Sequence, residues 1–200
     1  MFALDRELLP WEAELPSLRG AARVHLAIRL AWHLRQRDPQ RAAALAREAS
    51  PMLDMLPDSV RRSAQARFML VEGESRWLSG ELDAARSLAN DALALFAVVG
   101  DAAGRADARW LSAWIESDLG HSEACDAALA AGALDAREAG DAVRTDVFDA
   151  AAALFAVFCD LRQAMGRWGE RFDADADGLH PAASGWINDF RGIAAFHASD

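Results

Sequence analysis

The sequence contains no lysine and no tyrosine, and it has only two cysteines and six prolines in 200 residues. A chain without lysine has no amine for Schiff-base chemistry and no Walker lysine for phosphate, and the GxSxG motif of serine hydrolases is absent as well. The cysteines, Cys125 and Cys159, stand in apolar stretches with no CxxC spacing and no histidine partner, which excludes a disulfide framework and a zinc site. We expect both to be reduced core residues. We also expect no catalytic residue, metal site or cofactor in this chain.

Positive charge is also in short supply, because the chain has 21 basic and 31 acidic residues and a formal net charge of -10. An acidic chain repels phosphate backbones and anionic lipid head groups, so nucleic acid and membrane surfaces are not expected partners. The longest apolar run, AAAALFAVFC at 150–159, is about half of what spans a bilayer. The N-terminus has acids and prolines where a signal peptide needs a basic and then an apolar region. We therefore expect a cytoplasmic protein.

What the sequence does contain is helical periodicity. Apolar residues recur at spacings of three and four almost throughout, and no stretch alternates cleanly, which predicts an all-α chain. Asp38-Pro39 combines an N-cap acceptor with a residue that needs no N–H partner at the first helical position. Gly100-Asp101 and Gly140-Asp141 end one helix with a left-handed glycine and begin the next with an aspartate cap. Such short connections force neighbouring helices to pack antiparallel.

The chain also repeats itself. GDAAGRADARW at 100–110 is followed 40 residues later by GDAVRTDVFDA at 140–150, and repeats at this distance indicate one unit stacked on copies of itself. The pattern predicts four and a half helix hairpins. The expected first helices are 18–37, 58–79, 101–119, 141–160 and 180–198, and the expected second helices are 39–49, 81–98, 121–138 and 161–172. Alanine pairs seven residues apart should mark the close-packed face of the second helices: Ala42/Ala49, Ala85/Ala92 and Ala124/Ala131.

Residues 70–95, LVEGESRWLSGELDAARSLANDALAL, resemble a tetratricopeptide repeat. They carry a small residue (Gly73), a turn glycine (Gly80) and alanines at the two close-packing sites in the order typical of that family. The spacing is nearer 40 than the family's 34, and Arg76 stands where an aromatic residue is usual. The resemblance implies a right-handed superhelix of antiparallel helix hairpins, a tetratricopeptide-like α-solenoid with a period of about 40.

A second resemblance rests on LAWHLRQRDPQRAAALAREA at 30–49, GRADARWLSAWIE at 104–116 and HPAASGWINDFRG at 180–192. These segments are similar to the helical-repeat region that precedes GGDEF diguanylate cyclase domains in bacterial signalling proteins. The cyclase motif itself is absent, so this chain is not expected to be an enzyme. We expect an N-terminal extension at 1–17 and a repeat domain at 18–200 that is cut at its C-terminal end, with the output domain beyond it.

The expected function is binding on the concave face of the superhelix, where first helices place their side chains. Aromatic anchors beside charged residues are typical of a peptide groove. The partner would be a peptide, a protein or a second copy of the chain. The candidate partner-binding residues are Arg67, Glu74, Trp77, Asp107, Trp110, Trp114, Asp118, Trp186, Asp189 and His197. The alternatives are that the tryptophans only pack between helices, that the array is a dimerisation module or spacer, or that it is an enzyme or binds a small molecule.

Two further motifs are interpreted as structural. DADADG at 173–178 begins like a calcium loop, but Ser184 stands at the twelfth position where a glutamate should close the shell, and Pro181 stands at the ninth. We expect an acidic linker. The five histidines show no pairing that a metal site on one helix would need, and His33 occupies a core position. Asp107 and Asp118 are expected to be surface charges.

Overall fold

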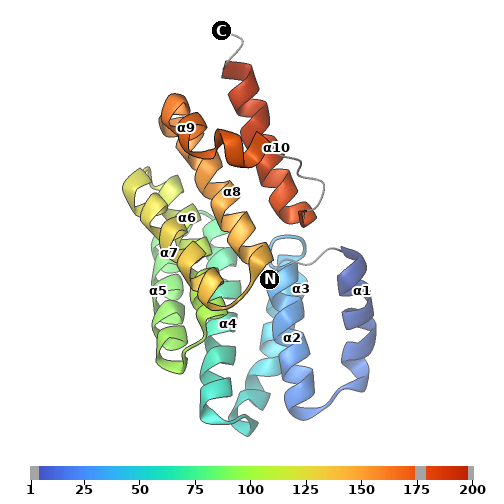
Figure 1. Ribbon diagram of the computed structural model, residues 1–200. Coiled ribbons are helices and arrows are strands. Elements are labelled where there is room, and N and C mark those ends of the chain that lie inside the picture. Colours follow the sequence, from blue (N-terminus) through green and yellow to red (C-terminus); the bar gives the residue numbers. More distant parts are fainter. Residues whose placement is uncertain (1–4, 174–178, 198–200) are drawn as a thin grey trace.

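The protein is all-helical. The computed structural model describes residues 5–173 and 179–197, and within them the chain forms ten α-helices, two short 3-10 helices and no strand (Figure 1). The α-helices are α1 (Asp5–Glu14), α2 (Gly20–Leu34), α3 (Pro39–Ala49), α4 (Asp58–Leu78), α5 (Leu82–Val99), α6 (Ala102–Asp118), α7 (Ser122–Glu138), α8 (Ala142–Cys159), α9 (Leu161–Asp173) and α10 (Pro181–His197). The 3-10 helices are Leu15–Ser17 and Ser50–Met55. The all-α prediction is confirmed.

The helix ends follow the predicted local chemistry. Gly100 and Gly140 adopt φ values of 71° and 65°, a left-handed conformation that side chains disfavour. Asp101 caps α6 by accepting a hydrogen bond of 2.7 Å from the backbone N–H of Gly104. Asp141 caps α8 in the same way, accepting from the N–H of Arg144 at 2.9 Å. The turns are therefore encoded by neighbouring residues.

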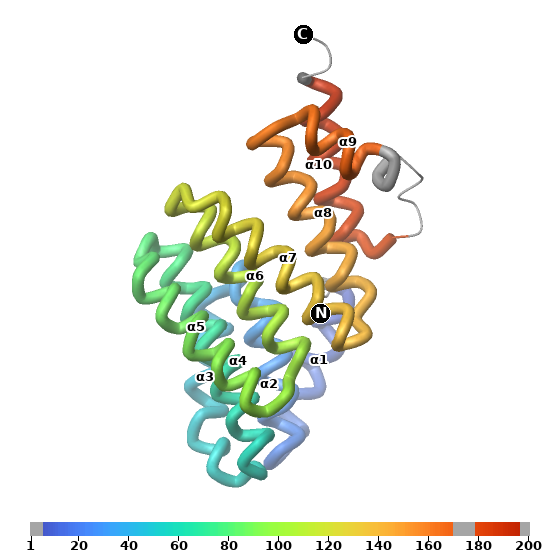
Figure 2. Tube along the Cα trace, turned by 60° about the vertical axis from the view of Figure 1, so that its left-hand side comes forward, coloured from blue at the N-terminus to red at the C-terminus, as the bar shows by residue number. Residues whose placement is uncertain are grey.

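The helices alternate between two roles along the chain. We call α2, α4, α6, α8 and α10 the first helices and α3, α5, α7 and α9 the second helices. Each second helix packs on the first helix before it, and first helices also contact one another, as α2 does with α4, α4 with α6, and α8 with α10. Figure 2 shows α5, α6, α7 and α8 lying side by side in chain order. Consecutive helices from α4 to α8 run in opposite directions (Figure 1).

The segment set apart as an N-terminal extension packs on the first helix pair. Leu8 of α1 and Leu15 of the following 3-10 helix are buried in one apolar cluster with Leu30 and Leu45. Trp11 packs against the same cluster and lies 5.6 Å from the ring of His33. Residues 5–17 therefore cover an apolar face that α2 would otherwise expose.

Small residues lie at the close contacts between helices. Two of the three predicted alanine pairs are buried there, and the third is displaced by one residue. The first two predicted pairs, Ala42/Ala49 and Ala85/Ala92, are fully buried. The third is wrong by one residue, because Ala124 is exposed and the buried face of α7 carries Cys125 and Gly132. A Cβ added to Gly132 would lie 2.2 Å from the ring of Phe148 on α8. Only glycine lets α7 approach that ring so closely.

The two cysteines differ in environment. Cys125 is buried, and burial, reinforced by the charge of Asp126, raises the pKa of its thiol to about 11. Cys159 is exposed at the end of α8, so the expectation that it belongs to the core is wrong.

The C-terminal helices have a core of their own. Trp168 of α9 packs with Ile187 and Phe190 of α10 and with apolar residues of α8. Of the acidic segment 173–178, residues 174–178 lie outside the described residues, so the calcium-loop interpretation is not addressed. Among the helices that the structure describes, none combines the length and the apolar character that crossing a bilayer requires.

Candidate functional site

The four predicted tryptophans come together. Trp77 on α4 and Trp114 on α6 have ring centroids 6.0 Å apart, and Trp186 on α10 lies 5.3 Å from Trp114 and 5.8 Å from Trp110. These four residues are called the tryptophan cluster. They are far apart in sequence, and the contacts between first helices bring them into one aromatic surface.

The members of the tryptophan cluster are not equally accessible. Trp110 is only 5% exposed and meets Phe148 edge-on at 5.4 Å, so the packing interpretation fits this residue. Trp77, Trp114 and Trp186 are half-buried. Their exposed ring area is available to a ligand, while Trp110 supports them from below.

A pocket of about 480 Å³ opens beside the tryptophan cluster. We call it the central pocket. All four tryptophans line it, and the other described lining residues come from the end of α2, from the α2–α3 turn and from the start of α10. They are His33, Arg35, Gln36, Arg37, His180, Pro181 and Ala182. The first helix pair and α10 thus contribute to the same pocket, which is of the size that holds a small ligand or a few side chains.

Neither histidine of the central pocket forms part of a metal cluster. Burial, with the nearby Arg35 and Arg29, lowers the pKa of His33 to about 3, so its ring is neutral at physiological pH. His180 accepts a hydrogen bond of 3.2 Å at Nδ1 from the N–H of Ala182. Across residues 5–173 and 179–197, no group of three or more potential ligand side chains is placed to hold a metal ion.

Asp107 is buried in an ion-pair relay. Its two carboxylate oxygens accept hydrogen bonds of 2.9 Å from Nε and Nη2 of Arg144, and it also pairs with Arg67. Arg67 and Arg144 reach onward to the capping residues Asp101 and Asp141. Burial alone raises the pKa of Asp107, but nearby positive charges, among them the guanidinium groups of Arg144 and Arg67, outweigh it and hold this pKa far below its ordinary value. The expectation that Asp107 is a surface charge is therefore wrong.

The relay joins successive first helices. Arg67 lies on α4, Asp107 on α6 and Arg144 on α8. A charge removed from water at a helix contact needs a partner from the neighbouring helix, and the 40-residue repeat supplies one from each side. Arg67 and Asp107 are thus connectors between helices.

Glu74 is the second buried acid among the candidate residues, and it fixes the α2–α3 turn. Its carboxylate lies 3.3 Å from Nε of Arg35 and accepts a hydrogen bond from the side-chain amide of Gln36. The Arg35 guanidinium also lies 3.7 Å above the ring of Trp32 and donates to the carbonyl of that residue at 2.6 Å. Glu74 therefore acts behind the central pocket, by positioning residues that line it.

The three remaining candidates, Asp118, Asp189 and His197, are not among the described residues that line the central pocket. Asp118 is exposed and accepts a 2.6 Å hydrogen bond from Nε1 of Trp77. Asp189 is exposed on α10. His197 ends α10, and its side chain lies outside the described residues. Of the ten candidates, the four tryptophans are thus the ones that line the central pocket.

Sequence reasoning missed the arginine side of the central pocket. Arg35, Gln36 and Arg37 belong to a turn in the first helix pair, and no local pattern indicates that this turn faces α10. Phe148 and Phe155, which extend the aromatic surface, do not align with tryptophans at the 40-residue period. Contacts between helices far apart in the sequence decide both placements, and a single repeat does not encode them.

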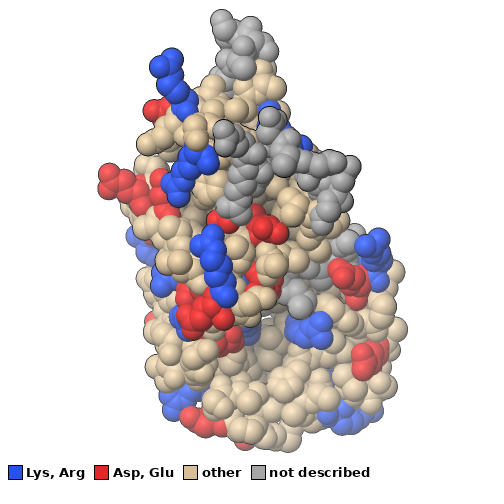
Figure 3. All heavy atoms as spheres, in the orientation of Figure 1, with Lys and Arg blue, Asp and Glu red and all other residues tan. Residues whose placement is uncertain are grey.

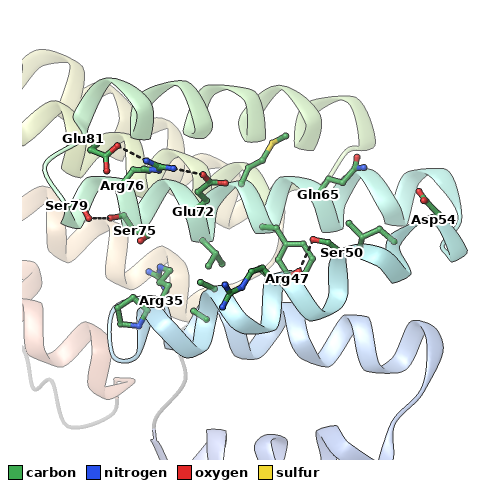
Figure 4. A pocket seen from close by; sticks show the side chains of 18 residues that line it. Arg35, Arg47, Ser50, Asp54, Gln65, Glu72, Ser75, Arg76, Ser79 and Glu81 are labelled. Atoms are coloured by element: carbon green, nitrogen blue, oxygen red, sulfur yellow. Dashed lines mark hydrogen bonds and ion pairs between the residues drawn. The ribbon is translucent and has the colours of Figure 1, made fainter.

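A larger hollow of about 950 Å³ lies between α3 and α4 (Figure 4). We call it the outer groove. Three of its charged residues are paired with one another, since Arg76 bonds to Glu81 at 2.7 Å and to Glu72 at 3.3 Å. Alanines of α3 form much of its apolar lining. Its described lining contains no tryptophan, so it lacks the aromatic surface of the central pocket.

Comparisons with protein-family models, with curated proteins and with solved structures gave no match to this chain. The arguments on function therefore rest on the site itself. On the face drawn in Figure 3, acidic and basic side chains of the described residues are interspersed, as expected for a solvated surface. The central pocket and the tryptophan cluster remain the most distinctive feature.

Proposed function

We propose that this chain is a non-catalytic binding module, a tetratricopeptide-like superhelix that holds a peptide or protein partner in the central pocket. The observation that carries the proposal is the convergence of Trp77, Trp114 and Trp186, each half-buried, beside a pocket of about 480 Å³. Rigid aromatic side chains that keep exposed ring area are typical anchors for a bound segment. A core that needed them only for packing would bury them, as it buries Trp110.

The state of the acids and of His33 supports binding rather than catalysis. Asp107 and Glu74 are held by arginines, and the pKa of His33 lies far from neutrality. A general acid or base works best with a pKa near the operating pH. These groups fit a structural role.

The proposed mechanism uses the shape of the array. Residues of the α2–α3 turn and of α10 line one pocket, so a partner that contacts both holds the two ends of the array at a fixed separation. Binding would then favour one curvature, because a ligand shifts a conformational equilibrium by its difference in affinity for the two states. In a bacterial signalling protein of the kind the sequence resembles, that change would bias how two diguanylate cyclase domains meet.

The test is selection of ligands from a displayed random-peptide library on the purified chain, followed by titration of the selected peptides. We expect Trp77→Ala and Trp114→Ala each to weaken binding about tenfold or more, because each removes a hot-spot anchor. The matched control is Leu134→Ala, which removes an exposed apolar side chain of α7 that is not among the residues lining the central pocket. Unchanged affinity in both tryptophan variants, with normal helical circular dichroism, would contradict the proposal.

A second candidate function is self-association through the C-terminal helices. Phe158 at the end of α8 and Phe196 near the end of α10 are 68% and 70% exposed, which is high for phenylalanine. Exposed apolar side chains of this size are typical of contact surfaces. Light scattering over a range of concentrations would show a dimer that the double variant Phe158→Ala/Phe196→Ala weakens. A monomer at all concentrations would contradict this candidate.

A further inference from the structure

Three side chains that line the central pocket have unused hydrogen-bonding groups. Among the residues that the structure describes, none is placed to bond the ring nitrogens of His33 or the indole N–H groups of Trp114 and Trp186. His33 is only 9% exposed. Buried polar groups in folded proteins are nearly always hydrogen-bonded, so an unpaired side chain at this depth needs an explanation. A ligand in the pocket would supply the missing partners.

These unused groups include more donors than acceptors. The neutral ring of His33 has one N–H and one acceptor nitrogen, and each indole adds a donor and no acceptor. Among the described side chains of the lining, Gln36 contributes a further amide oxygen, whereas Nδ1 of His180 already accepts from the N–H of Ala182. A ligand that complements this lining therefore has more free acceptors than donors.

The charged groups at this site already have partners within the chain. The guanidinium of Arg35 pairs with the buried carboxylate of Glu74 at 3.3 Å. The carboxylate of Asp118 accepts the indole N–H of Trp77 at 2.6 Å. The unused groups described above are all neutral, so neutral hydrogen bonds and apolar contact, rather than formal charge, would select the ligand.

The tryptophan rings form a stepped apolar surface. The ring centroid of Trp114 lies 6.0 Å from that of Trp77 and 5.3 Å from that of Trp186. A polyproline II helix advances about 3.1 Å per residue, so two of its residues cover about 6 Å, which matches the distance between neighbouring rings. Aromatic-lined grooves bind proline-rich segments of this conformation in other domains.

We infer that the occupant of the central pocket is a proline-rich segment in the polyproline II conformation. This inference rests on the proposed function and specifies the partner. Proline has no N–H, and a polyproline II helix has no internal hydrogen bonds, so the carbonyl groups of such a segment are free acceptors. The proline rings would contact the tryptophan cluster, and the carbonyl groups would accept from the indole N–H groups of Trp114 and Trp186. His33 would bond to the backbone of an intervening residue.

The first part of the experiment is the same peptide selection, analysed for proline. We expect enrichment of prolines two or three positions apart. In a selected peptide, exchange of one such proline for alanine should weaken binding about fivefold, because a ring contact is lost and the free peptide becomes less ordered. Exchange of a residue outside the proline pair for alanine is the control and should change the affinity less than about twofold.

The second part removes single N–H groups from the chain. Exchange of tryptophan for phenylalanine keeps an aromatic ring and deletes the indole N–H. Trp114→Phe and Trp186→Phe should each weaken a selected peptide about fivefold to tenfold, because a hydrogen bond to the ligand is lost. Trp77→Phe is the matched control, since Asp118 already holds that N–H, and its loss should stay within about twofold. Circular dichroism checks the fold of each variant, and either of the first two variants suffices for the comparison.

The outcomes separate this inference from the proposed function. Selected peptides that need the tryptophans but carry no excess of proline overturn the inference and leave the proposed function standing. Equal losses in the three phenylalanine variants also overturn it, because the unpaired N–H groups then play no part in binding. If no peptide is selected and synthetic decaproline does not bind, both fail. Binding of tetramethylammonium by a chain that selects no peptide would assign the aromatic surface to a small cation and would overturn the peptide as its ligand.

Discussion

The buried ion-pair relay and the tryptophan cluster lie on the same helices, but their environments differ. Asp107 and Arg144 are each less than 5% exposed and their charges are paired. Three of the four tryptophans keep exposed ring area beside the central pocket. Sequence reasoning had placed acids and tryptophans in one groove. The buried ion pairs connect helices, whereas the half-buried tryptophans form a surface that remains able to bind a partner.

Physical chemistry explains why the two regions are built from different residues. A buried charge is costly unless a partner neutralises it, so the relay gives little net stability when intact and loses much when one partner is removed. A half-exposed indole has no such partner requirement, so its removal costs mainly the apolar area it covers. The following predictions, ordered from the largest expected effect to the smallest, test this contrast.

The largest effect is expected for Asp107→Ala. Removal of this carboxylate leaves Arg144 and Arg67 as uncompensated charges, and breaking a buried pair in this way costs about 3–5 kcal/mol of unfolding free energy. Urea denaturation followed by circular dichroism measures it. The control is Glu72→Ala, which removes one partner of an exposed ion pair and should leave the midpoint unchanged. A loss below about 1 kcal/mol for Asp107→Ala would remove the distinction between relay and surface pair.

The next largest loss of stability is expected at Gly132, which packs against Phe148, the ring that contacts Trp110. Gly132→Ala should destabilise the fold by about 1–3 kcal/mol, because the added Cβ would collide with Phe148 and force helices apart. Gly166→Ala on α9 is the matched control, since open space surrounds that position and alanine favours a helix by about 0.5–1 kcal/mol. Thermal unfolding of both variants checks the prediction. Equal shifts of the same sign would contradict the close approach of α7 to α8.

A pH-dependent effect of intermediate size is expected from His33. Its pKa is about 3 in the folded chain and near 6.5 when unfolded, so only the unfolded state gains a proton as pH falls below about 6.5. Stability should therefore decrease by about 2 kcal/mol between pH 7 and pH 5, above the range where most carboxylates titrate. Denaturant titrations at both pH values measure this loss.

His33→Gln should remove most of that decrease, whatever its own effect at pH 7. His25→Gln, at an exposed position on the same helix, should leave the decrease intact. The same pH dependence in His33→Gln as in the unaltered chain would show that other groups cause it.

The smallest effect on stability is expected for Trp77→Ala, at about 1 kcal/mol, because its ring is half-buried and lies at the edge of the cluster. Trp110→Ala should cost about 3–5 kcal/mol, as for other buried aromatic residues. Denaturant midpoints compare the two. Equal losses would mean that Trp77 is a packing residue like Trp110, which would weaken the case for a binding surface.

The helices and their ends were largely predictable from neighbouring residues. Asp38-Pro39 does begin a helix, with Asp38 accepting from the N–H of Arg41 at 2.9 Å. In contrast, α1 carries Pro10 in its interior, and its apolar contacts come from α2 and α3. That helix was not expected, because packing rather than local sequence stabilises it.

The sequence by itself determined the helices from α2 onward and their order, because helix caps, left-handed glycines and apolar periodicity act over a few residues. Tertiary structure alone decided that Asp107 is buried while Trp77 keeps exposed ring area, and that the α2–α3 turn and α10 line one pocket. Burial and the meeting of distant helices depend on contacts between residues far apart in the chain, and no local sequence pattern specifies these contacts.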